Sequence, residues 1–229
     1  MSSQVAERYL EVQRRVREAA VRAGRDPECV RLIAVSKTKP AGMIREAMEA
    51  GAVDFGENRP QELRDKCAEL PDTLRWHMIG HLQKNKIKYV VGHACLIHSI
   101  DTLQLAEEVS AAAVKAGLVM PVLLEVNVAG EESKFGLRPE ETEAAVRAAA
   151  LLPGIEVRGL MTIAPYTDDP ESNRVYFRQL RNLSIDIASK NIDNVNMCEL
   201  SMGMTGDYEV AVEEGATLVR VGTGIFGER

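Results

Sequence analysis

The feature that most constrains the fold is an alternation of short apolar segments with amphipathic segments, repeated along a chain of 229 residues. The segment from Val122 to Val128 shows it best, because it is almost continuously aliphatic and rich in β-branched residues. Such a run is typical of a parallel strand that is covered on both faces. Parallel strands are joined by crossover helices, which supply that cover. The alternation therefore predicts an α/β fold.

Eight strands alternating with helices are expected after an amphipathic opening helix over residues 4–23, in which Val5, Tyr9, Val12 and Val16 recur at helical spacing. The expected strands are residues 31–36, 52–56, 75–79, 94–100, 122–128, 156–162, 197–201 and 217–222. The expected helices are residues 40–50, 60–70, a basic helix at 82–90, one at 101–116 capped by Asp101, 139–152, 171–189 and 208–214.

Eight strands alternating with helices in one chain of this size predict a closed (β/α)₈ TIM barrel, with an extra N-terminal helix, as a single domain over residues 1–229. The rival is an open doubly wound sheet. No Gly-x-Gly-x-x-Gly motif follows the first strand, which disfavours a dinucleotide-binding version of that sheet.

Lys37 stands directly after the first strand, and barrel enzymes keep their chemistry at the carboxyl ends of the strands. Burial disfavours the charged form of an amine and frees its lone pair for attack on a carbonyl carbon. Lys37 is therefore a candidate for Schiff-base chemistry, whereas the ordinary interpretation is an exposed lysine just past a strand.

A phosphate site is expected at the loops after strands seven and eight, where barrels commonly bind phosphate. These loops read Ser201-Met-Gly-Met-Thr205 and Gly222-Thr-Gly224. Glycines let backbone amides approach an anion, and hydroxyls add directional hydrogen bonds. Plain turns are the alternative. A phosphate corner together with a reactive lysine suggests a phosphorylated aldehyde, and pyridoxal 5′-phosphate (PLP) fits both ends.

Arg220 lies two residues before Gly222, so its side chain should share the inward face of the barrel. A buried guanidinium requires a partner. That partner is either a carboxylate on a neighbouring strand or the pyridine nitrogen of PLP. In the second case a permanent cation would keep that nitrogen unprotonated and make the ring a weak electron sink.

The chain also resembles a known family, the pyridoxal phosphate homeostasis proteins, which are similar to the barrel domain of alanine racemase. The resemblance covers essentially all of the chain after the first helix. Its motifs are Ala34-Val-Ser-Lys-Thr-Lys-Pro40, Phe55-Gly-Glu-Asn-Arg-Pro-Gln-Glu62, Trp76-His-Met-Ile-Gly-His-Leu-Gln-Lys-Asn-Lys86, Glu125-Val-Asn127 with Lys134-Phe-Gly136, Gly159-Leu-Met161, Leu200-Ser-Met-Gly-Met204 and Val219-Arg-Val-Gly-Thr-Gly-Ile-Phe-Gly227.

The resemblance implies roles for residues at the matching positions. Lys37 would form the Schiff base, and Arg220 would contact the ring nitrogen. The phosphate would lie among Ser201, Gly222 and Thr223, and the pocket would be lined by Asn58, His81 and Met161. Thr205 stands where many relatives have Ser, which keeps the hydroxyl.

The function implied by the resemblance is a protein that holds PLP and takes part in intracellular vitamin B6 and amino-acid homeostasis without robust catalysis. Its partners would be PLP and PLP-dependent apoenzymes as recipients, and it would be a monomer. An amino-acid racemase is the first alternative. It needs an acid on the face opposite the lysine, and Tyr166 is the tyrosine to check. The second alternative is a cofactor-free Schiff-base aldolase acting on a sugar phosphate. Lys134 is a second candidate amine.

Composition sets the remaining expectations. Net charge is −6, which disfavours nucleic acid and anionic lipid as partners. The four cysteines include no Cys-x-x-Cys pair, and no zincin motif links His77 to His81, so neither a disulfide framework nor a metal site is expected. Apolar runs are too short to span a bilayer, and the N-terminus has no apolar signal core. A cytoplasmic location is expected.

Overall fold

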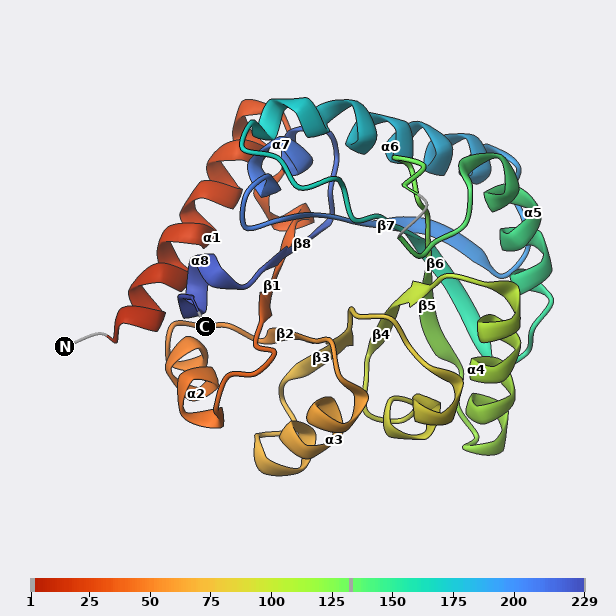
Figure 1. Cartoon of the computed structure of the whole chain (residues 1–229), viewed down its shortest axis with the longest axis horizontal. Coiled ribbons are helices and arrows are strands. Elements are labelled where there is room, and N and C mark those ends of the chain that lie inside the picture. The colour runs from red at the N-terminus through yellow and green to blue at the C-terminus, as the bar shows by residue number, and fades with distance from the viewer. Residues whose placement is uncertain (1–2, 132–133, 229) are drawn as a thin grey trace.

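Eight parallel strands close into a barrel in sequential order, β1 pairing with β2 and so on until β8 pairs with β1 (Figure 1). The computed structural model describes residues 3–131 and 134–228. The TIM barrel predicted from the alternation is confirmed. The strands are β1 (Arg31–Val35), β2 (Asp54–Glu57), β3 (Arg75–Met78), β4 (Leu96–Ile100), β5 (Met120–Glu125), β6 (Ile155–Met161), β7 (Val195–Met204) and β8 (Leu218–Val221).

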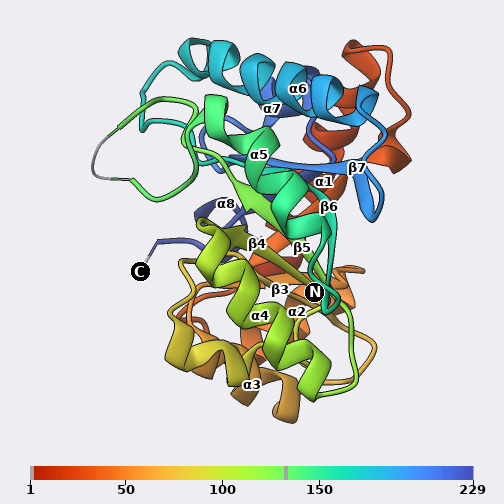
Figure 2. The ribbon, with the colours of Figure 1, turned by 90° about the vertical axis from the view of Figure 1, so that its right-hand side faces the viewer.

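Helices surround the barrel and cover the outer faces of its strands (Figures 1 and 2). They are α1 (Gln4–Arg22), α2 (Ala41–Glu49), α3 (Pro60–Glu69), α4 (Leu103–Lys115), α5 (Pro139–Ala150), α6 (Arg174–Ser189), α7 (Tyr208–Glu213) and α8 (Thr223–Phe226). Three 3₁₀ segments complete the described elements: η1 (Pro27–Cys29), η2 (Lys84–Tyr89) and η3 (Pro170–Asn173).

Helix α1 is the predicted extra N-terminal helix. Ser3 caps it, because its hydroxyl accepts a hydrogen bond from the amide of Ala6 at 3.1 Å. Its buried stripe includes Tyr9, Val12 and Val16, at the spacing seen in the sequence. The helix packs against α7 and α8, and therefore lies beside the loops that follow β7 and β8.

The strands alternate between a large outer core and a small inner one, as a period of two requires. On β8, Val219 and Val221 pack into the outer core, while Leu218 lies inside the barrel. The inner apolar cluster contains Ile33, Leu96, Leu123, Met161 and Leu218. Buried polar side chains fill much of the remaining interior, among them Asp54, His77, His98, Ser201 and Arg220. Arg220 therefore points inward, as predicted.

Several local predictions were wrong. Asp101 does not cap α4; Thr102 does, accepting from the amide of Leu105 at 3.2 Å. The basic segment is 3₁₀ rather than α-helical over Lys84–Tyr89. It has six residues and buries only the side chain of Ile87, which is too little for a stable α-helix. The helix expected from residue 171 begins at Arg174, after η3, and α8 was not expected at all.

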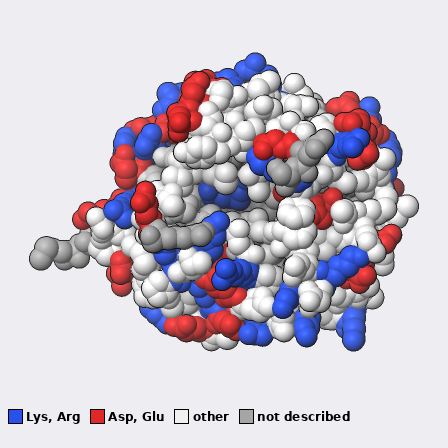
Figure 3. Space-filling model, viewed as in Figure 1, with Lys and Arg blue, Asp and Glu red and all other residues white. Residues whose placement is uncertain are grey.

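Acidic and basic side chains are interspersed over the face seen in Figure 3, and a hollow opens near its centre. No broad patch of one charge is visible on this face, in keeping with the net charge of −6. Within residues 3–131 and 134–228, no helix is both long enough and apolar enough to cross a membrane.

Candidate functional site

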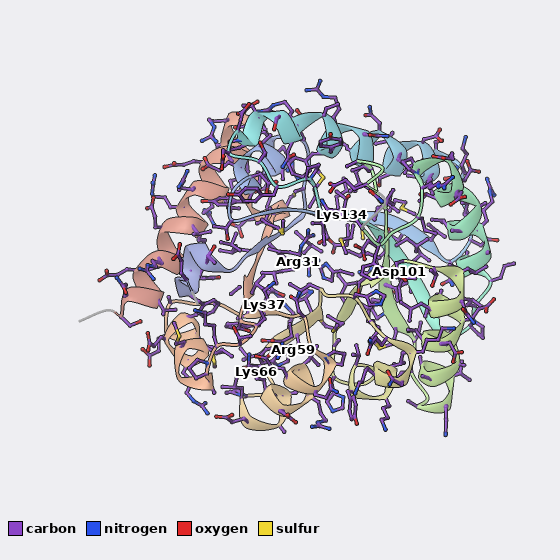
Figure 4. All side chains as sticks on the ribbon, viewed as in Figure 1. Arg31, Lys37, Arg59, Lys66, Asp101 and Lys134 are labelled. Atoms are coloured by element: carbon purple, nitrogen blue, oxygen red, sulfur yellow. The ribbon has the colours of Figure 1, made fainter. Side chains whose placement is uncertain are left out.

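Lys37 follows β1 at the carboxyl end of the barrel and is partly buried. Ile33 belongs to the inner cluster, and the alternation carries Val35 and then Lys37 toward the same side. Figure 4 shows Lys37 near the inner rim of the barrel. The sequence thus predicted the position of this amine correctly.

The backbone just before Lys37 is held by two buried side chains. Ser36 is fully buried, and its hydroxyl donates to Oε1 of Glu57 at 2.6 Å. The ammonium of Lys66, on α3, donates to the carbonyl of Ser36 at 2.8 Å and to the same Glu57 oxygen at 2.8 Å. Burial raises the pKa of Glu57, and the nearby Lys66 opposes that rise. The peptide leading into Lys37 is therefore fixed from behind.

The backbone just after Lys37 is held by Lys66 through Glu62. Lys66 donates to Oε1 of Glu62 at 2.7 Å, and that oxygen also accepts from the amide of Thr38 at 2.6 Å. Thr38 adopts a φ of 64°, which is costly for a non-glycine residue and needs such support. We call Glu57, Glu62 and Lys66 the clamp. In Figure 4, Lys66 lies farther from the barrel axis than Lys37.

Arg220 is almost completely buried inside the barrel. Nη2 donates to the carbonyl of Thr162 at 2.8 Å, and Nη1 donates to the hydroxyl of Ser201. No carboxylate in the described part of the chain forms a salt bridge with it, so the neighbouring-strand ion pair considered above is absent there. Burial lowers the pKa of Arg220 to about 10, and the carboxylates of Glu125 and Asp207 oppose that fall. The guanidinium is therefore still a cation at neutral pH.

Ser201 is fully buried, and its hydroxyl forms hydrogen bonds inside the barrel. It lies 2.8 Å from Nδ1 of His98 and accepts from Arg220. Both partners lie on the inner face, so the hydroxyl is directed into the barrel interior. Its predicted contact with a phosphate stays a prediction, and the structure gives the hydroxyl another use.

Thr205 was not among the residues predicted to contact the phosphate. Its hydroxyl lies 3.3 Å from the amide nitrogen of Gly222 and 3.5 Å from that of Gly224. The loops after β7 and β8 therefore meet, and a threonine hydroxyl and glycine amides share one corner with Thr223. The available signal was the second hydroxyl in the Ser201–Thr205 segment, four residues after the first.

The other side of the opening carries His81 and Asn58. His81 Nδ1 lies 2.9 Å from Oδ2 of Asp101, and its ring stacks on Phe135 with centroids 3.9 Å apart. The carboxylate that was expected to cap a helix thus orients a histidine instead. Oδ1 of Asn58 is buried and has no hydrogen-bond partner within the described chain. An unpaired buried acceptor is costly, which marks a place where a ligand donor would be stabilising.

Met161, Lys134 and Tyr166 differ in their access to the opening. Met161 is fully buried in the inner cluster. Nζ of Lys134 donates to Oε1 of Glu131 at 2.6 Å and to the carbonyl of Ala164 at 3.3 Å, so this amine is already engaged. Tyr166 is 93% exposed. A tyrosine this exposed is not held as an acid against a buried site.

Glu125 ends β5 with its carboxyl group nearly buried. Burial and the charge of Asp101 raise its pKa to about 7, against the opposing effect of the Arg220 cation. Within the part of the chain that the structure describes, no group of three or more His, Cys, Asp or Glu residues is arranged to hold a metal ion.

Comparison with known proteins identifies the family. A family model described as "Alanine racemase, N-terminal domain" matches residues 11–229. A curated pyridoxal phosphate homeostasis protein from Aquifex aeolicus is 48% identical over 224 residues, with 97% of each chain covered. The chain belongs to the pyridoxal phosphate homeostasis protein family. A mouse member of this family is 39% identical, with 95% of this chain and 84% of the mouse protein covered.

Solved structures agree with that family assignment. PipY of Synechococcus elongatus, solved with PLP bound, superposes with a TM-score of 0.81 at 38% identity, covering 97% of this chain and all of PipY. A Bifidobacterium adolescentis protein of unknown function gives a TM-score of 0.90 at 40% identity, with 97% and 94% covered. Alanine racemase from Corynebacterium glutamicum shares only the fold, with a TM-score of 0.71 at 16% identity, 99% of this chain and 61% of the racemase being covered.

Proposed function

We propose that this protein binds PLP through Lys37 and acts in intracellular PLP and amino-acid homeostasis. The observation that carries the proposal is a lysine whose flanking backbone is clamped at the end of β1, beside a corner of glycine amides and a threonine hydroxyl at the end of the neighbouring strand β8. A homeostasis protein from Aquifex aeolicus at 48% identity, and PipY with bound PLP at 38%, support it. The cofactor supplies an aldehyde that condenses with a lysine amine to a Schiff base, with loss of water.

The glycines of the corner are needed for its packing, most clearly Gly224. A Cβ on Gly224 would lie 3.0 Å from Val221 and 3.3 Å from Thr205, so any larger residue would crowd the corner. A Cβ on Gly222 would lie 3.4 Å from Val35. The amides of Gly222 and Gly224 converge on the Thr205 hydroxyl, and converging backbone amides are typical of an anion-binding concavity. We assign the phosphate to Gly222, Thr223 and Thr205. Ser201, whose hydroxyl meets His98 and Arg220, would act on the cofactor through Arg220 rather than on the phosphate.

The remaining predicted residues keep their proposed roles on the ring. Arg220 would face the pyridine nitrogen, and Asn58, His81 and Met161 would line the pocket. The unpartnered Oδ1 of Asn58 supports a polar contact with the cofactor. Because Met161 is fully buried, we propose that it forms apolar floor rather than a direct polar contact.

We infer that the protein is not a robust racemase. Racemisation needs an acid opposite the lysine, and Tyr166 is 93% exposed. A cationic Arg220 at the ring nitrogen would also weaken the electron sink. The cofactor-free aldolase is disfavoured by the same relatives that support PLP.

We further propose that the chain works as one PLP-binding domain, as a monomer, in the cytoplasm, with PLP-dependent apoenzymes as recipients. The cysteines of the described chain are free thiols, as is usual in a reducing compartment. On the face shown in Figure 3 the charges are interspersed and give nucleic acid no continuous basic track.

An absorbance spectrum of the purified protein, before and after borohydride, tests the proposal, with mass spectrometry to find the modified peptide. We expect a visible band that borohydride abolishes and an adduct on Lys37. Lys37→Ala should lose the adduct, while Lys84→Ala, at an exposed lysine, should retain it. A trapped adduct on Lys134 in Lys37→Ala would reassign the amine. A colourless protein that takes up no added PLP would sink the proposal and favour the aldolase.

A further inference from the structure

A continuous line of buried hydrogen bonds crosses the barrel interior, from Asp54 at the start of β2 to Arg220 on β8. Asp54 Oδ1 lies 3.0 Å from His77 Nε2, and His77 Nδ1 lies 3.0 Å from His98 Nε2. His98 Nδ1 lies 2.8 Å from the Ser201 hydroxyl, which meets Arg220. Both histidines, the serine and the arginine are at most 4% exposed.

The chemistry of the two ends gives this line one direction. Arginine can only donate, and an ionised aspartate can only accept. Burial lowers the pKa of His77 and of His98, so both rings are neutral and each has one N–H. Burial raises the pKa of Asp54, but hydrogen bonds from His77 and Arg75 outweigh it and hold that pKa at about 2. The terminal aspartate is therefore an anion at neutral pH.

Each proton that forms a hydrogen bond between Asp54 and Arg220 then has one possible position. His77 must donate from Nε2 to Asp54, which leaves its Nδ1 as an acceptor. His98 must donate from Nε2 to that nitrogen, which leaves its own Nδ1 to accept the Ser201 proton. With its proton committed to His98, the Ser201 oxygen can only accept from Arg220. The guanidinium is thus fixed by Ser201 on one nitrogen and by the Thr162 carbonyl on the other.

We propose that Asp54, His77, His98 and Ser201 form a directional relay that positions Arg220 as a hydrogen-bond donor toward the ring nitrogen of PLP. This inference rests on the proposed function, because it assigns the ring contact to Arg220. The four are positioning residues: they hold the guanidinium so that its remaining N–H groups meet an unprotonated ring nitrogen. Without the relay, Ser201 could turn its proton elsewhere, and Arg220 could shift toward the carboxylate of Glu125.

The charged groups around the relay support this direction. Arg75 donates to Asp54 through Nε at 2.8 Å and Nη2 at 2.6 Å, which holds the carboxylate as the terminal acceptor. Arg31 is near enough to disfavour a positive charge on either histidine. The Cys95 sulfur lies 3.6 Å from His77 Nε2, and burial raises the pKa of this thiol to about 11, so it adds no negative charge.

The first experiment uses the protein without PLP, so it does not depend on the proposed function. Side-chain ¹⁵N NMR of the histidines at pH 7, assigned with single His→Gln variants, should show His77 and His98 as neutral rings with the proton on Nε2. A charged ring, or a proton on Nδ1 of either residue, would overturn the direction of the relay. If the histidines do not show this proton arrangement, the relay is rejected even if Lys37 binds PLP.

The second experiment measures the ring nitrogen of ¹⁵N-labelled PLP bound to the variants Ser201→Ala, His98→Leu and His77→Leu. We expect the wild-type signal of an unprotonated ring and a shift toward the protonated value in each variant, with Ser201→Ala shifting most and His77→Leu least. His93→Leu, the same change at an exposed histidine, should leave the signal unchanged. A purely structural role would lower stability and leave the ring signal where it is.

The outcomes separate the two proposals. If the folded variants, confirmed by circular dichroism, keep the wild-type ring signal, the relay is wrong while the adduct on Lys37 still stands. If wild-type protein forms no adduct, the proposed function fails, and the histidine tautomers still decide the relay. Should His98→Leu not fold, Ser201→Ala removes only one oxygen and gives the same answer.

Discussion

At the scale of single residues, the turn that carries Lys37 depends on one other lysine. Lys66 reaches the carbonyl of Ser36 and both clamp carboxylates, and its side chain is 9% exposed. The Glu57 carboxylate that it meets is fully buried. Removing one partner of a buried ion pair leaves the other charge uncompensated, which costs more than the pair itself contributes.

Lys66→Met should therefore loosen the turn and raise the pKa of Glu57 further. We expect a loss of about 3–5 kcal/mol in the free energy of unfolding, together with less PLP bound to Lys37. Urea denaturation and mass spectrometry of the trapped adduct measure the two effects. Lys84→Met, at an exposed lysine, is the matched control and should change neither. Wild-type stability and full adduct in Lys66→Met would show that the clamp is dispensable.

At the scale of elements, α1 joins the barrel both through an apolar stripe and through ion pairs. Val16 is 2% exposed within that stripe. On the other side, Arg22 forms ion pairs at 3.0 Å with Glu209 and Glu213, at α7. These ion pairs are half exposed on the arginine side and contribute little to stability. The apolar stripe therefore dominates the attachment of α1.

The same substitution at two positions of α1 tests this ranking. Val16→Ala removes buried methyl groups and should lower the free energy of unfolding by about 2 kcal/mol. Val21 is 64% exposed, and Val21→Ala should stay within about 0.5 kcal/mol of wild type. Both changes alter helix propensity equally, so the difference in urea-induced unfolding isolates burial. Equal effects at the two positions would contradict the ranking.

At the scale of the whole molecule, the closed barrel removes the free strand edges through which sheets associate. We expect a monomer for this reason. Sedimentation velocity at micromolar concentration, with and without PLP, should give the mass of one chain in both cases. A mass of two chains in either condition would contradict this.

The amino-acid sequence by itself determined the barrel, because eight apolar strands alternating with amphipathic helices have few other ways to cover both faces of a parallel sheet. It also determined that Lys37 lies at the rim and that Arg220 points inward. Both conclusions follow from strand ends and from a period of two, which are local properties.

Only the tertiary structure decided which side chains meet. Asp54 and Ser201 lie far apart in sequence, and barrel closure brings them into one hydrogen-bonded line. The uses of Asp101 for His81 and of Thr205 for the glycine amides were hidden for the same reason. Local patterns fix the face on which a residue lies, but the neighbours across that face are set by strand order and register, which are properties of the closed sheet.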